Sequence, residues 1–94
     1  PCIIDVRSPL EWRRSHIRTS INIPITLLRK KMPIVAGKKT TPIVAICLSA
    51  HRSIPAVRII RACGFEDVAQ LKGGMLSWWK HRLPCEARER ETKL

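Results

Sequence analysis

The apolar run Ile43-Val44-Ala45-Ile46 is the feature that most constrains how this chain can fold. It follows a polar turn at 37–42 and ends at Cys47. A short, continuous apolar run is typical of a strand that is buried on both faces, and such strands occur in parallel sheets covered by helices. We therefore expect a central strand over 43–46, with Cys47 at its carboxyl end.

Strand and helix patterns alternate on either side of this run. Shorter apolar segments predict strands over 2–6, 21–23 and 68–71. Apolar residues at helical spacing predict helices over 8–15, 25–32, 53–63 and 75–83. This alternation predicts an α/β fold with a central, mostly parallel sheet and helices on both faces. Ligands bind such sheets at the carboxyl ends of strands, which points to the segment 47–52.

Capping signals predict where the first helix begins. Ser8, Pro9 and Glu11 provide an N-cap, a first-turn proline and a capping-box carboxylate. Leu10 and Trp12 of this short helix are expected to face the core.

Glycine, proline and tryptophan mark later boundaries. Pro33 is expected to end the helix over 25–32, and Gly64 can adopt the left-handed conformation that closes a helix. Trp78 and Trp79 are adjacent on a helix, so one should lie in the core and the other on a partly exposed flank. The charged tail 86–94 is expected to fray.

Length and charge limit the protein's class. The 94 residues suffice for one domain, 1–94, including the charged tail. Eighteen Lys and Arg against seven Asp and Glu give a net charge of +11, which attracts anions. No aromatic residues alternate with the basic ones, so a solvated basic surface is favoured over a nucleic-acid site, although an acidic protein or RNA partner stays open.

The four cysteines lie at positions 2, 47, 63 and 85, without a Cys-x-x-Cys or Cys/His ligand pair. Cys2 and Cys63 lie in apolar segments and are expected to be buried, inert thiols, whereas Cys85 is expected to be exposed. With no signal-peptide pattern or long apolar run, and a reduced thiol as working group, a cytoplasmic location without membrane association is expected. The chain begins with Pro1, so a targeting segment before it stays possible.

The segment 47–53 joins the best strand to the best helix. Its main-chain N–H groups can curl into a cradle around the sulfur of Cys47, where the helix N-terminus and nearby positive charge stabilise an anion. For an arbitrary cysteine, a small buried residue that ends a strand would be the better interpretation. The loop favours a nucleophile instead.

Four short motifs occur in order along the chain. They are Asp-Val-Arg followed by Glu-Trp within 5–12, His-Ile with Asn-Ile-Pro within 16–24, Cys-x4-Arg-Ser at 47–53, and Gly-Phe with Gly-Gly-x-x-x-Trp within 64–78. In these motifs the sequence resembles the rhodanese family over nearly its whole length.

The resemblance implies a rhodanese-like sulfurtransferase. Cys47 would accept sulfane sulfur from thiosulfate, a small anionic donor, or from a protein persulfide donor, become a persulfide, and pass the sulfur to a thiol or cyanide, without metal or organic cofactor. Arg52 would close the cradle. The loop amides of Leu48, Ser49, Ala50, His51 and Arg52 would hold the persulfide, and Asp5, Arg7 and Ser53 would support the site.

Other interpretations stay open at this point. The loop from Cys47 to Arg52 has six residues, and in this length it resembles the loop of the sulfurtransferases. Related phosphatases and arsenate reductases have a loop one residue longer. Ala50 replaces the glycine that is usual in the family, which keeps a non-catalytic docking or regulatory module as an alternative. His51 is placed to orient an anionic donor, whereas His16 and His81 are expected to be surface or capping residues.

In the family, a further element usually precedes the first strand, and this sequence does not include it. The domain is therefore expected to be trimmed or unusually small.

Overall fold

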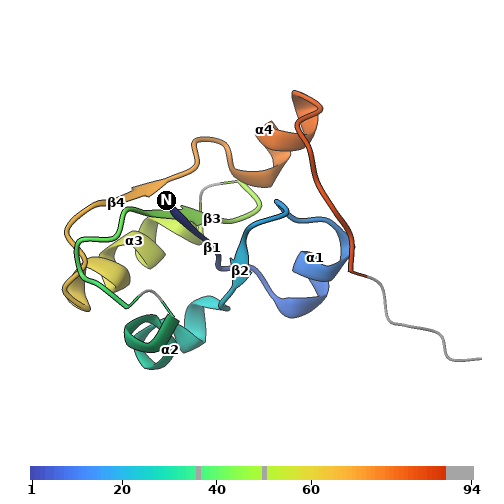
Figure 1. Cartoon of the computed structure of the whole chain (residues 1–94). Coiled ribbons are helices and arrows are strands. Elements are labelled where there is room, and N and C mark those ends of the chain that lie inside the picture. The colour runs from blue at the N-terminus through green and yellow to red at the C-terminus, as the bar shows by residue number, and fades with distance from the viewer. Residues whose placement is uncertain (36, 50, 89–94) are drawn as a thin grey trace, which may run out of the picture.

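A four-stranded sheet organises the residues that this computed structural model describes, which are 1–35, 37–49 and 51–88. The elements in order are β1 (Cys2–Asp5), α1 (Pro9–Arg14), β2 (Ile21–Asn22), the 3₁₀ helix η1 (Ile25–Leu27), α2 (Leu28–Val35), β3 (Ile43–Ile46), α3 (Ser53–Ala62), β4 (Val68–Gln70) and α4 (Gly74–Lys80). The strands lie in the order β2-β1-β3-β4, and every neighbouring pair is parallel. Figure 1 shows this sheet with its helices. The predicted α/β fold is confirmed.

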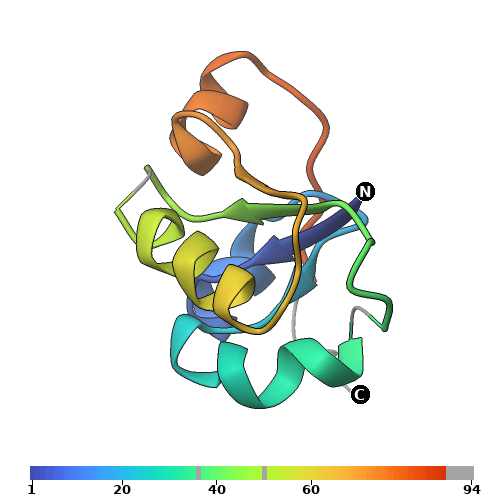
Figure 2. The same cartoon turned by 90° about the vertical axis from the view of Figure 1, so that its left-hand side faces the viewer.

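Side chains of β3 alternate between two hydrophobic clusters, one on each face of the sheet. Ile43 and Ala45 belong to the larger cluster, which also holds Leu28 of α2 and Ile60 of α3. Ile46 belongs to the smaller cluster with Met75 and other residues. Accordingly, α2 and α3 lie against one face and α4 lies over the other (Figure 2). Burial of both faces explains why the sequence of β3 is continuously apolar.

The predicted start of α1 is confirmed in detail. Ser8 is the N-cap, its hydroxyl accepts from the backbone N–H of Glu11, and the Glu11 carboxylate accepts from the backbone N–H of Ser8. The predicted burial of Leu10 is wrong, because this side chain is 60% exposed. A helix of six residues has room for only one inward face, and the half-buried Trp12 and Glu11 occupy it.

The prediction that Pro33 ends the second helix is also wrong. α2 continues to Val35 with Pro33 inside it. Proline lacks the N–H that would donate to the carbonyl four residues earlier, here that of Arg29. Because Arg29 is exposed, water can satisfy its carbonyl, and the helix continues for two further residues.

Two expectations about the second half of the chain are confirmed. Gly64 closes α3 with a φ of +100°. Trp78 packs against the smaller cluster, whereas Trp79 is 37% exposed.

The C-terminal segment returns to α1 rather than fraying at Glu86. The backbones of His16 and Glu86 exchange two hydrogen bonds of 2.9 Å, and the N–H of Arg88 donates to the carbonyl of Arg13 at 2.8 Å. The Arg88 guanidinium also lies 5.1 Å from the centre of the Trp12 ring. The predicted fraying is therefore wrong for 86–88, while 89–94 lie outside the described residues.

His16 is buried, so a surface role is wrong for it, but the alternative expectation of a capping role is met because its Nδ1 lies 2.5 Å from the carbonyl oxygen of Trp12 in α1. It is 0% exposed and stacks on Trp12, with ring centres 3.7 Å apart. Its Nε2 lies 3.1 Å from Oε1 of Glu86. His81 also caps its helix, α4, because its Nδ1 lies 2.8 Å from the carbonyl oxygen of Ser77.

The other cysteines differ in exposure. Cys85 is exposed as predicted, but Cys2 and Cys63 are only half-buried, because each lies at the end of an element. Burial nevertheless raises the pKa of the Cys2 thiol.

Among the described residues, no helix combines the length and the apolar character that crossing a membrane requires.

Candidate active site

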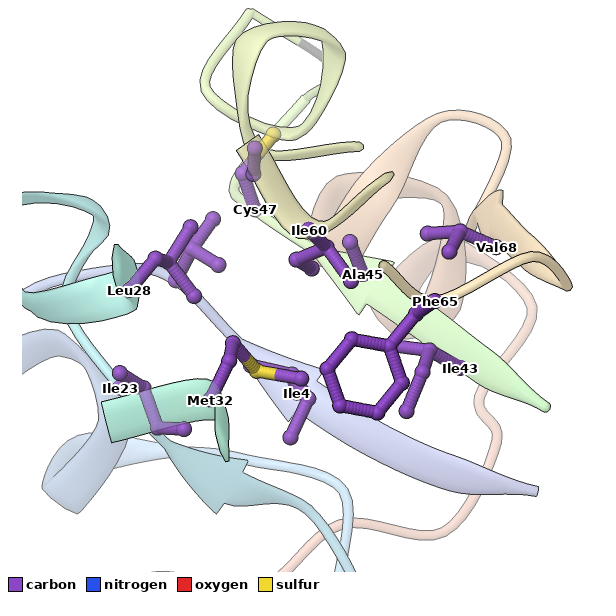
Figure 3. Close-up of a cluster of buried hydrophobic side chains, with 12 residues drawn as sticks. Ile4, Ile23, Leu28, Met32, Ile43, Ala45, Cys47, Ile60, Phe65 and Val68 are labelled. Atoms are coloured by element: carbon purple, nitrogen blue, oxygen red, sulfur yellow. The ribbon is translucent and has the colours of Figure 1, made fainter. Parts of the chain in front are cut away.

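Cys47 follows the last residue of β3, at the carboxyl edge of the sheet. It continues the row of Ile43 and Ala45 that faces the larger cluster, and Figure 3 shows it at the upper end of that row. The residue is 1% exposed. The predicted position of the candidate nucleophile, between the central strand and the following helix, is confirmed.

The loop after Cys47 is partly open to solvent. Leu48, Ser49 and Arg52 are half-buried and His51 is exposed. Ala50 lies outside the described residues. The expected effect of an alanine in place of the family's usual loop glycine therefore stays a prediction.

The thiol of Cys47 is tied to the start of α3 by a hydrogen bond. Its Sγ donates to Oγ of the buried Ser53 at 3.4 Å, and the Ser53 hydroxyl donates to Oε1 of Gln70 at 2.7 Å. Gln70 is the last residue of β4. These two hydrogen bonds orient the sulfur toward the N-terminus of α3. Sequence patterns pointed to Ser53 but gave no signal for Gln70, because only the fold brings β4 beside α3.

Arg52 occupies the N-cap position of α3, and its guanidinium binds Glu11 of α1 in a bidentate ion pair. Nη1 lies 2.6 Å from Oε1, and Nη2 lies 2.8 Å from Oε2. This hydrogen bonding lowers the pKa of Glu11 to about 2 and raises the pKa of Arg52. Coulombic interactions with Cys47 and Asp5 are smaller causes that also raise the pKa of Arg52.

Asp5 and Arg7 form a second ion pair, at the carboxyl end of β1. Asp5 is 0% and Arg7 1% exposed, and the Arg7 Nη2 donates to Oδ2 of Asp5 at 2.8 Å. The same nitrogen donates to the carbonyl of Ser15 at 2.7 Å, and the guanidinium carbon lies 5.8 Å from the centre of the Trp79 ring. The pair therefore connects β1 with the end of α1 and with α4, and its supporting role in the reaction stays a prediction.

The first turn of α4 fixes the backbone of the loop. The N–H groups of Met75 and Leu76 donate to the carbonyls of Cys47 and Leu48 at 2.8 and 2.9 Å. Gly74 makes this approach possible, because a Cβ at this position would lie 2.4 Å from the Cys47 carbonyl oxygen. The second glycine of the Gly-Gly motif thus lets α4 approach the loop and position the backbone of the candidate nucleophile.

An open groove of about 280 Å³ lies beside this site, between α3 and β4. Its lining includes Arg58, Arg61 and the same Gln70 that binds Ser53. Within the described residues, no three His, Cys, Asp or Glu side chains lie close enough together to hold a metal ion.

The fold and the site together define a class of protein. An all-parallel sheet carries a buried cysteine after its central strand, and an arginine five positions later is the N-cap of the next helix. The family model of the rhodanese-like domain matches residues 1–81. The chain belongs to the rhodanese-like domain family.

Relatives with known sequences include proteins that are longer than this chain. An uncharacterised protein of Synechocystis sp. is 36% identical over 83 residues, which is 87% of this chain and 45% of that protein. A probable adenylyltransferase/sulfurtransferase, MoeZ of Mycobacterium tuberculosis, is 32% identical over 87% of this chain and 21% of its own length. The chain thus spans less than half the length of these two relatives. A sulfurtransferase of Allochromatium vinosum is 30% identical, and the match covers 93% of this chain and 79% of that protein.

Solved structures share the fold over nearly the whole chain. The rhodanese-like domain of the Alr3790 protein from Anabaena sp. has a TM-score of 0.82 at 29% identity, covering 90% of this chain and 97% of that one. A rhodanese-related protein from Thermoplasma volcanium has a TM-score of 0.81 at 33% identity, covering 94% and 84%.

Proposed function

We propose that this chain is a sulfurtransferase that carries sulfane sulfur as a persulfide on Cys47. The observation that carries this proposal is the position of Cys47, whose thiol is directed by Ser53 toward the N-terminus of α3, next to Arg52. A cysteine that merely filled the core would need neither a hydrogen-bonded sulfur nor a neighbouring helix N-terminus. Membership of the rhodanese-like family and the relatives named as sulfurtransferases support the same reaction.

The proposed reaction has two displacement steps. The Cys47 thiolate attacks the outer sulfur of thiosulfate, a new S–S bond forms, and sulfite leaves with the electron pair of the broken S–S bond. An acceptor thiolate or cyanide then attacks the outer sulfur of the persulfide, which returns Cys47 to the thiolate and produces a persulfide or thiocyanate. Neither step needs an external oxidant, reductant, metal or organic cofactor.

The loop and the helix that follows it supply positive potential for the anions in both steps. The first helical hydrogen bond of α3 runs from the N–H of Ala56 to the carbonyl of Arg52. N–H groups ahead of that bond point toward the loop, as at any helix N-terminus, and favour negative charge there. We assign to the main-chain amides of 48–52 the role of binding the persulfide, and to Arg52 the role of supplying positive charge at the rim of the cradle.

A protein persulfide can serve as donor in place of thiosulfate, and an acidic protein suits this chain as a partner. The net charge of +11 steers acidic surfaces toward it, and the groove beside Gln70 is lined by two arginines. We place the reaction in a reducing compartment such as the cytoplasm, where a free thiol persists.

A thiocyanate assay tests this function. Purified protein is supplied with thiosulfate and cyanide, and the parent chain is compared with Cys47→Ser and with Cys85→Ser, which removes an exposed thiol away from the site. We expect turnover in the parent and in Cys85→Ser, and none in Cys47→Ser. If the parent fails with thiosulfate and also with a persulfide donor, the domain is a docking module rather than an enzyme.

A further inference from the structure

We propose that Glu11 is a specificity-determining residue that weakens the preference of the site for dianionic sulfur donors and so favours monoanionic ones, such as persulfides. The proposal rests on the sulfurtransferase function of Cys47 and adds the class of donor to it. It concerns the charge that a donor meets at the rim of the cradle, where Arg52 lies.

Glu11 is held in place from two sides. Its Oε1 accepts from the backbone N–H of Ser8 at 3.1 Å as part of the capping box. The same oxygen and Oε2 bind the two terminal nitrogens of Arg52 at 2.6 and 2.8 Å. The carboxylate therefore has a fixed position beside the guanidinium, set by the start of α1.

The pair has no net charge, which changes what an incoming anion experiences. A lone Arg52 would attract each negative charge of a donor, and a dianion twice as strongly as a monoanion. With Glu11 beside it, the attraction from the guanidinium is opposed by repulsion from the carboxylate. The other ion pair near the site, Asp5 with Arg7, is likewise neutral and buried. Arg58 and Arg61 line the groove between α3 and β4 rather than the loop, so at the loop itself main-chain amides and the N-terminus of α3 are left as the main attraction, and they suit a single negative charge.

Two donors of the same chemistry but different charge isolate this effect. Thiosulfate is a dianion that releases sulfite, and methanethiosulfonate is a monoanion that releases methanesulfinate. In both cases the Cys47 thiolate attacks the outer sulfur, the donor S–S bond breaks, and the leaving group takes the electron pair. The ratio of kcat/KM for thiosulfate to kcat/KM for methanethiosulfonate therefore reports the effect of the second charge.

The first variant is Glu11→Gln, because glutamine also serves at this position of a capping box and preserves the start of α1. We expect the ratio to rise roughly threefold to tenfold, since one full negative charge is removed near the site. Glu66→Gln changes the net charge equally at an exposed position outside the site, and Ser8→Ala weakens the capping box without changing charge. Neither control should move the ratio by more than about twofold.

A second variant tests the opposite sign and keeps the proposal testable if Glu11→Gln does not fold. Arg52→Gln leaves the Glu11 carboxylate without its partner, so the ratio should fall below that of the parent. An unchanged ratio in both variants, or a shift in the same direction in both, would overturn the assignment of Glu11. If the parent transfers sulfur from neither donor, the proposed function itself fails.

Discussion

Arg52 and Glu11 lie 41 positions apart in the sequence, yet both terminal guanidinium nitrogens of Arg52 bind the Glu11 carboxylate at 2.6 and 2.8 Å. This contact joins the start of α1, which follows β1, to the start of α3, which follows the loop of Cys47. The motif near the N-terminus and the loop motif are therefore two parts of one site. Substitutions in α1 are expected to change the chemistry at Cys47 as well as stability.

The ion pair predicts a pH dependence of stability. The pKa of Glu11 is about 2 in the folded protein, below its ordinary value of 4.5, so the ionised carboxylate stabilises the folded state. This contribution is fully present above pH 4.5 and is lost as the pH falls toward 2. Because both side chains are partly exposed to solvent, we expect it to be no more than about 1 kcal/mol. Urea unfolding should show a stability difference between the parent and Glu11→Gln above pH 4.5 that shrinks near pH 2, and an equal difference at both pH values would contradict the prediction.

Loss of the buried Asp5 charge should destabilise the fold strongly. Asp5→Asn leaves the 1%-exposed Arg7 as an uncompensated buried cation, and removal of one partner of a buried ion pair typically costs about 3–5 kcal/mol. Asp67→Asn removes the same charge at an exposed position and should cost less than about 0.5 kcal/mol. The free energy of unfolding in urea measures both. Similar values for the two variants would show that the Asp5 pair does not hold β1 to α1 and α4.

Gly74 should be irreplaceable for a reason that Gly37 does not share. Both have positive φ, +59° and +68°, but a Cβ at Gly74 meets the backbone of Cys47 and Leu48, whereas a Cβ at Gly37 meets nothing within 4 Å. Gly37→Ala should cost about 1 kcal/mol, from its φ alone. Gly74→Ala should cost about 3 kcal/mol or more, since the loop or α4 must move as well. Thermal unfolding compares the two, and equal losses would contradict the contact between α4 and the loop.

Removal of the Ser53 hydroxyl should affect the rate of sulfur transfer more than stability. Ser53→Ala deletes the acceptor that orients the Cys47 thiol, and the exposed Gln70 can bind water instead. We expect kcat to fall about fivefold, the equivalent of one neutral hydrogen bond. Thr26→Ala, which removes an exposed hydroxyl in η1, is the matched control and should leave kcat unchanged. A kcat equal to that of the parent in Ser53→Ala would mean that the hydrogen bond has no role in the reaction.

Local signals explain which features could be predicted from the sequence. The strand at 43–46, the capping box of Ser8 and the position of Cys47 depend on neighbouring residues, so periodicity and capping rules identified them. Leu10 was misplaced because its exposure depends on how the short α1 sits on the rest of the fold. The capping role of His16 is local, but its burial was not predicted because it involves Glu86, 70 positions later.

The same limit applies to the site. Sequence patterns indicated Cys47 and Arg52, but the partners of these residues, Gln70 and Glu11, come from distant elements. The expected role of Arg52 in the cradle stays a prediction, and its pairing with Glu11 was not anticipated. Contacts between elements that are far apart in the sequence follow from the order of the strands, which no local pattern encodes.

Intact-mass analysis after incubation with thiosulfate or a persulfide donor tests the central claim most directly. The parent chain should gain one sulfur atom and lose it again when cyanide is added, and Cys85→Ser should behave in the same way. Cys47→Ser should gain no sulfur that cyanide can remove. Equal sulfur uptake by Cys47→Ser, or no uptake by the parent from either donor, would contradict the claim that Cys47 carries the persulfide.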